Sequence, residues 1–106
     1  MTVYLAIATD GVELRMPEHT TDLYASYWER LGPDQIVRLL AEHDAGELSE
    51  DRQSVMIPVA TLRRLAAGRV SEGWDAEFEA MLEKARERGW LNESGDAVQA
   101  HLERER

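Results

Sequence analysis

The first 16 residues constrain the fold more than any other part of this chain, because they match a β-hairpin in two independent ways. An apolar run at residues 3–8 leads to Asp10-Gly11, a preferred tight-turn pair, and residues 12–16 then alternate between apolar and polar. A two-residue turn at Asp10-Gly11 also places Val3 and the larger apolar residues of the predicted pairs on one face, and Ala6, Ala8, Glu13 and Arg15 on the other. The pairs that this turn predicts are Thr9 with Val12, Ile7 with Leu14, and Leu5 with Met16.

The hairpin needs further structure to be stable, because two strands alone are marginal in water. Pro17 lacks the amide donor of a sheet ladder, so we expect the second strand to end there. The short apolar run at residues 54–57, just before Pro58, is the candidate for a third strand added to the hairpin.

Helical spacing of apolar residues predicts about five helices in the rest of the chain. Leu23, Tyr27 and Leu31 lie four residues apart, behind Thr20 or Thr21 as an N-cap. The predicted ranges are 20 or 21 to 31, 33–44, 58–67, 71–88, and 92 or 94 to 103. We therefore predict a single α+β domain over residues 1–106, with the hairpin packed against about five helices.

Composition narrows the classes of protein to which the chain can belong. It has no Cys, which excludes disulfides, thiolate zinc sites and cysteine nucleophiles. Its 21 acidic and 12 basic residues give a net charge of −9, which repels nucleic acid and anionic membranes. We expect a cytoplasmic protein, because no stretch resembles a signal peptide or a membrane span. The Arg-rich basic set, with a single Lys, is typical of GC-rich bacterial genes.

Motifs of catalysis or of metal and phosphate binding are missing. No serine has a G-x-S-x-G setting, and no two of the three histidines have a metal-binding spacing. The acidic loop at residues 42–51 lacks the alternation of oxygen ligands that a calcium loop needs. The sequence therefore predicts no cofactor, no metal site and no catalytic residues.

Two hypotheses of function rest on the basic segment at residues 58–71. They are alternatives to the leading hypothesis of a protein-interaction module, which is given below. Arg63, Arg64 and Arg69 are the only charged residues of this segment, so it is where an anion could bind. The first alternative is a small enzyme or ligand-binding domain whose site is built from residues far apart in the sequence. In such a site, Arg63 or Arg64 would hold an anion. Candidates for the other groups of the site are His43, His101, Glu13 and Asp44.

The other alternative is a helix-turn-helix, in which the same arginines would contact DNA phosphates. The helix that would read the bases opens with Glu72, Asp75 and Glu77, however, and acidic residues at that position oppose binding.

The leading hypothesis is an acidic interaction or regulatory module without catalytic activity. On a helix over residues 20–31, Tyr24 and Trp28 would meet on a flank beside the main apolar stripe. An exposed Tyr–Trp pair would be a natural anchor for another protein, a second copy of this chain included.

Overall fold

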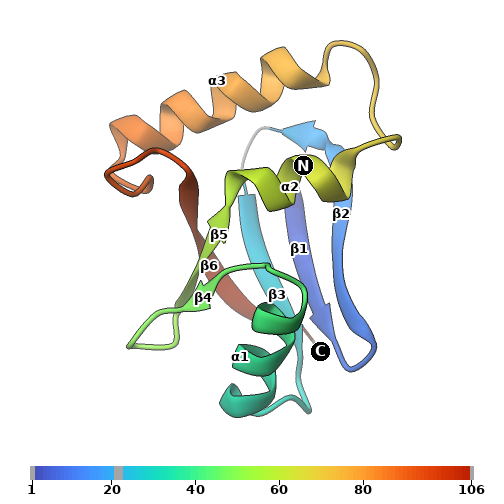
Figure 1. Ribbon diagram of the computed structural model, residues 1–106, viewed down its shortest axis with the longest axis vertical. Coiled ribbons are helices and arrows are strands. Elements are labelled where there is room, and N and C mark those ends of the chain that lie inside the picture. The colour runs from blue at the N-terminus through green and yellow to red at the C-terminus, as the bar shows by residue number, and fades with distance from the viewer. Residues whose placement is uncertain (1, 21–22, 106) are drawn as a thin grey trace.

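The computed structural model describes residues 2–20 and 23–105 of the chain (Figure 1). These residues form six strands and three helices. In chain order they are β1 (Thr2–Ala8), β2 (Gly11–Thr20), β3 (Leu23–Trp28), α1 (Pro33–Glu42), β4 (Glu47–Leu48), β5 (Ser54–Pro58), α2 (Val59–Ala66), α3 (Trp74–Glu87) and β6 (Ala97–Glu105).

All six strands join one mixed sheet in the order β2-β1-β3-β6-β5-β4. The three central strands, β1, β3 and β6, run parallel, and the outer pairings are antiparallel. The predicted α+β class is confirmed. The prediction of a hairpin, with at most a third strand, packed against about five helices is wrong, because the described residues hold a six-stranded sheet and three helices.

Two of the expected helices are strands of this sheet. The range from 20 or 21 to 31 contains β3, and the range from 92 or 94 to 103 contains most of β6. Both sequences also alternate, as in Val98, Ala100 and Leu102, and the structure buries these alternate residues. Of the two proposed N-caps, Thr20 belongs to β2 and Thr21 lies outside the described residues.

The predicted hairpin is confirmed, but its register is displaced by two residues. Ile7 pairs with Val12, and Leu5 pairs with Leu14. A shift of two preserves which side chains share a face, so Leu5, Ile7 and Leu14 are buried as the pattern predicts. Thr9 and Met16, which the pattern places on the same face, are exposed instead. The second strand continues past Pro17 through an irregularity at Met16, which has φ 55°. Pro17 is tolerated there because β2 is an edge strand.

The third strand predicted at residues 54–57 exists as β5, but it does not join the hairpin. β5 pairs with β4 and β6, and two strands separate it from β1. The space beside the hairpin is instead taken by β3, which runs parallel to β1.

The three remaining helices are confirmed, with ends close to those that the sequence predicts. α1 begins at Pro33, and the Gly32 amide donates to the Gln35 side chain at 2.9 Å. α3 carries acidic residues in its first turn and basic residues in its last, as its dipole favours. None of the described helices has the length and apolar character to cross a membrane.

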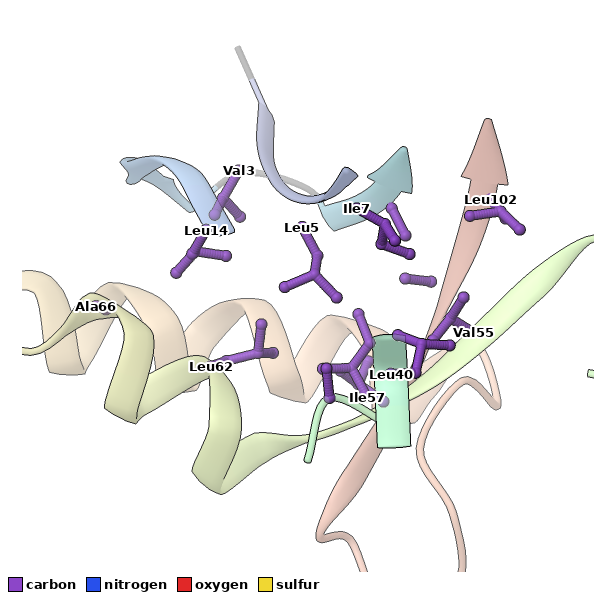
Figure 2. Packing of buried hydrophobic residues seen from close by; sticks show 14 of the residues in the cluster. Val3, Leu5, Ile7, Leu14, Leu40, Val55, Ile57, Leu62, Ala66 and Leu102 are labelled. Carbon is purple, nitrogen blue, oxygen red and sulfur yellow. The ribbon is translucent and has the colours of Figure 1, made fainter. Parts of the chain in front are cut away.

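The hydrophobic core lies between one face of the sheet and the helices. Figure 2 shows Leu5, Leu14 and Leu62 pointing toward one another between the strands and α2. The strand residues of this core cluster alternate along each strand: Val3, Leu5 and Ile7 from β1, Leu14 from β2, Ala25 from β3, Val55 and Ile57 from β5, and Val98, Ala100 and Leu102 from β6. All three helices add buried residues to this same cluster, so they cover one face of the sheet.

Candidate functional site

The opposite side of the sheet, which we call the uncovered face, is the candidate functional site. The register aligns Tyr4 of β1 with Tyr24 of β3, and Tyr24 with His101 of β6. None of these three side chains belongs to the core cluster, because each alternates with a buried neighbour. The main residues of the uncovered face are Tyr4, Tyr24, Ser26, Trp28, Gln99, His101 and Glu103.

Aromatic side chains dominate the middle of the uncovered face. The rings of Tyr4 and Tyr24 stack with their centroids 4.9 Å apart and an interplanar angle of 15°. Trp28 lies four residues along β3 from Tyr24 and is 41% exposed, and the guanidinium of Arg30 lies 5.9 Å from the centre of its ring. These rings form an apolar surface on the uncovered face, outside the hydrophobic core.

The predicted contact between Tyr24 and Trp28 does not form. It rested on a helix, whereas on strand β3 the two residues are separated by about 13 Å of backbone. They nevertheless share the uncovered face, because four positions along a strand return to the same side. Their role in binding a partner stays a prediction.

A cavity of about 670 Å³ opens on the uncovered face above β3, β6 and β5. His101 lies at its middle, in register with Tyr24 on one side and Ser54 on the other. Two carboxylates line the cavity, Glu103 from β6 and Asp51 from the turn before β5. The remaining lining residues include Trp90 and Gln99.

Trp90 is held at this cavity by the C-terminal cap of α3. Gly89 has φ +78°, the left-handed conformation of a helix C-cap, and its amide donates to the Arg86 carbonyl at 3.1 Å. The Trp90 amide donates to the Ala85 carbonyl at 2.8 Å, which completes a Schellman motif. The Trp90 carbonyl then accepts the Gln99 amide at 2.7 Å, which fixes the residue against β6. The side chain stays 36% exposed.

Asp51 is held by hydrogen bonds within the turn between β4 and β5. Its Oδ1 accepts the Ser49 hydroxyl at 2.6 Å and the Gln53 amide at 3.0 Å. The Ser49 hydroxyl, followed by the Gln53 amide, stabilises the ionised form and lowers the pKa of Asp51 below its usual 3.8. The carboxylate is therefore charged at neutral pH.

This lowered pKa predicts a specific loss of stability in acid. Because the pKa is lower in the folded chain than in the unfolded chain, the stabilisation is fully present above pH 3.8 and disappears as pH falls through the folded value. In chemical unfolding at a series of pH values, the stability difference between wild type and Asp51→Asn should shrink below pH 3.8.

A carboxyl ¹³C titration by NMR measures the Asp51 pKa directly. We expect a midpoint below 3.8 in the wild type, and a higher midpoint in Ser49→Ala, which removes the hydroxyl donor. A wild-type midpoint at or above 3.8 would contradict the hydrogen bonds assigned to this turn.

The three arginines predicted to bind an anion contact groups of the chain itself. Arg63 of α2 forms ion pairs with Asp75, at 3.1 Å, and with Glu79, both on α3. Arg64 donates to the His43 carbonyl at 2.8 Å, and Arg69 donates to the Leu14 carbonyl at 2.6 Å. Their role in anion binding stays a prediction, and none of the three lines the cavity on the uncovered face.

The groups proposed for a site assembled from distant residues do not share one cavity. His101 lines the cavity on the uncovered face, whereas His43 packs near Gly11 at the end of α1. Asp44 and Glu13 line two other hollows. No group of three potential metal ligands occurs among the residues that the structure describes.

The geometry of α2 and α3 does not support a helix-turn-helix. Residues 67–73 separate the two helices, which is about twice the usual three- to four-residue turn. Asp75 and Glu77 lie in the first turn of α3, where contacts with bases would have to form.

Sequence reasoning missed Glu103, Asp51 and Trp90 as residues of a site. The position of Trp90 directly after Gly89 indicates a role in the cap of α3 but gives no sign of a place in the cavity. Glu103 would have been placed beside His101 and Gln99 if residues 98–103 had been interpreted by their alternation.

Searches of protein-family models, of curated proteins and of solved structures gave no match to this chain.

Proposed function

We propose that this chain is a small acidic cytoplasmic module that binds another protein through its uncovered face and has no catalytic activity of its own. The observation that carries this proposal is the exposure of Trp28, at 41%, on a sheet face on which none of the described helices packs. Trp and Tyr are the residue types that most often dominate binding energy at interfaces.

The stacked Tyr4–Tyr24 pair supports the same proposal. Two rings that already stack in the free protein lose little conformational freedom on binding, so more of their contact energy contributes to affinity. Strands β1, β3 and β6 also provide a rigid support for these side chains, because they form the centre of the sheet.

A comparison of two exposed apolar residues on opposite sides of the molecule tests this function. Trp28→Glu places a charge on the uncovered face, and Val37→Glu places one on α1, where Val37 is 49% exposed. Wild type and both variants would serve as baits in an extract of the cells that make the protein. We expect Trp28→Glu to reduce partner recovery by roughly tenfold or more, as loss of an anchoring aromatic does. Val37→Glu should leave recovery unchanged.

Binding of the purified partner, measured by calorimetry, must reproduce the difference between the two variants. Light scattering over a concentration series covers the case in which the partner is a second copy, because Trp28→Glu would then convert a dimer to a monomer. If no protein distinguishes the two variants and the wild type is monomeric, the proposed function is wrong.

A further inference from the structure

The cavity on the uncovered face combines negative charge with aromatic walls. Asp51 and Glu103 are carboxylates, and among the described residues that line the cavity there is no Lys or Arg. The ion pairs found among the described residues join other acids, at Glu13, Asp75, Glu79 and Glu83. The two cavity carboxylates therefore lack a cationic partner in the described part of this chain.

The residues that line the cavity differ from one end of it to the other. Gln99, His101 and Glu103 follow one another on the outward side of β6, so Glu103 lies about 13 Å along the strand from Gln99. Trp90 is bonded through its carbonyl to the Gln99 amide, and therefore stands at the end opposite to Glu103. Tyr24 flanks His101 between these ends. The cavity is therefore aromatic at the end formed by Trp90 and negatively charged at the end formed by Glu103.

This combination suits a long cationic side chain. The stem of a Lys or Arg packs along aromatic surface, a guanidinium or ammonium is attracted to the face of a ring, and carboxylates hold the charge by charge-assisted hydrogen bonds. The guanidinium of Arg88 lies 5.1 Å from the centre of the Trp90 ring, so a cation of the chain itself already contacts this aromatic wall. The net charge of −9 attracts a basic segment from a distance.

We propose that the cavity bounded by Trp90, Tyr24, Glu103 and Asp51 binds a basic segment of the partner protein, with a Lys or Arg side chain at Glu103 and Asp51 and the adjoining residues of that segment along Tyr24 and Trp90. This proposal rests on the proposed function and gives the partner's chemistry. The volume of about 670 Å³ exceeds one side chain and accommodates the flanking residues of a peptide.

Titration of the protein with an acetylated hexa-arginine peptide, followed by NMR, tests the proposal. We expect saturable shifts at the Trp90 indole and at the amides of Gln99, His101 and Glu103, and no such shifts with hexa-glutamate. Glu103→Gln should weaken binding by roughly five- to tenfold, because it removes one charged partner. Trp90→Leu, which keeps apolar contacts but removes the ring, should weaken it by roughly threefold or more.

The matched control is Glu42→Gln, at the exposed end of α1, which changes net charge by the same amount as Glu103→Gln. General attraction of a cationic peptide to an acidic protein would respond equally to both variants. Equal weakening, or shifts spread evenly over the acidic surface, would therefore overturn the proposal. Tetramethylammonium as a second probe separates the sources of the cation. If it binds as tightly as the peptide, the cavity is a site for free small cations, and the assignment to a partner is wrong.

Failure of this proposal is distinguishable from failure of the proposed function. A partner that requires Trp28 but binds Glu103→Gln with undiminished affinity would confirm the uncovered face as an interface and overturn the basic-side-chain pocket. Absence of any partner that distinguishes Trp28→Glu from Val37→Glu would instead remove the function on which the pocket rests.

Discussion

Replacement of Gly46 by Ala is expected to lower the free energy of unfolding by about 3–5 kcal/mol, the sum of backbone strain and overpacking. Gly46 has φ +114°, which side chains other than glycine's rarely adopt. A Cβ on its backbone would also lie 1.9 Å from the carbonyl oxygen of Met56, which is far inside van der Waals contact. Because that oxygen belongs to the backbone of β5, no side-chain rotation can relieve the clash.

Gly68→Ala is the matched control for this change. Gly68 also has a positive φ, +78°, but an added Cβ there would meet no atom within 4 Å. It should therefore cost only the conformational strain, about 1 kcal/mol. Urea unfolding followed by circular dichroism measures both variants. Equal losses in the two variants would contradict the close approach of Gly46 to Met56.

The Gly46 position also affects the cavity. It precedes β4, whose residues Glu47 and Leu48 pair with Met56 and Val55. This pairing supports the turn that carries Asp51, so Gly46→Ala should weaken binding of a basic peptide even where the protein remains folded. The fold and the candidate site are coupled at this point of the chain.

Secondary structure was predictable where one periodicity dominated. α3 has a single interpretation, because its apolar residues, acidic start, basic end and Gly89 cap all agree. The segments of β3 and β6 satisfy two periodicities at once, with apolar residues four apart and also two apart. For short segments of this kind, the pattern of apolar residues alone does not distinguish a helix from a strand. These two segments form strands rather than helices because they pair with neighbouring parallel strands, and the local sequence does not show such long-range pairing.

The same ambiguity explains what was missed at the candidate site. Tyr24 and Trp28 lie off the apolar stripe of residues 23–31, which marks them as candidates for a partner contact, and the structure places both on the uncovered face. Because the sequence predicts a helix where the structure has strand β3, the predicted neighbour of Tyr24, Trp28, is wrong. The actual neighbour of Tyr24 is Tyr4, which comes from a strand that only the sheet order brings beside it. The cavity likewise needs β3, β5 and β6 together, and no local motif encodes that assembly.

Phe78 is one of the buried residues that pack α3 on the core. Its side chain is only 2% exposed, and its ring stacks on Trp74 with centroids 4.6 Å apart and an angle of 11°. The guanidinium carbon of Arg63 lies 4.9 Å from the Phe78 ring centre, while that group also pairs with Asp75 and Glu79. Phe78 therefore contributes both to the apolar core and to the contact between α2 and α3.

Phe78→Ala should lower the free energy of unfolding by about 3–5 kcal/mol, because it removes the buried ring and leaves a cavity. Phe78→Leu, which keeps most of the apolar volume, should cost roughly 1.5 kcal/mol or less. Urea unfolding at low and at high salt separates packing from charge. Salt screens the exposed ion pairs of Arg63 but not the core, so the loss in Phe78→Ala should persist at 1 M NaCl, where the Debye length is about 3 Å. A loss that disappears with salt would mean that Phe78 acts mainly through the charged groups of α2 and α3, rather than by packing.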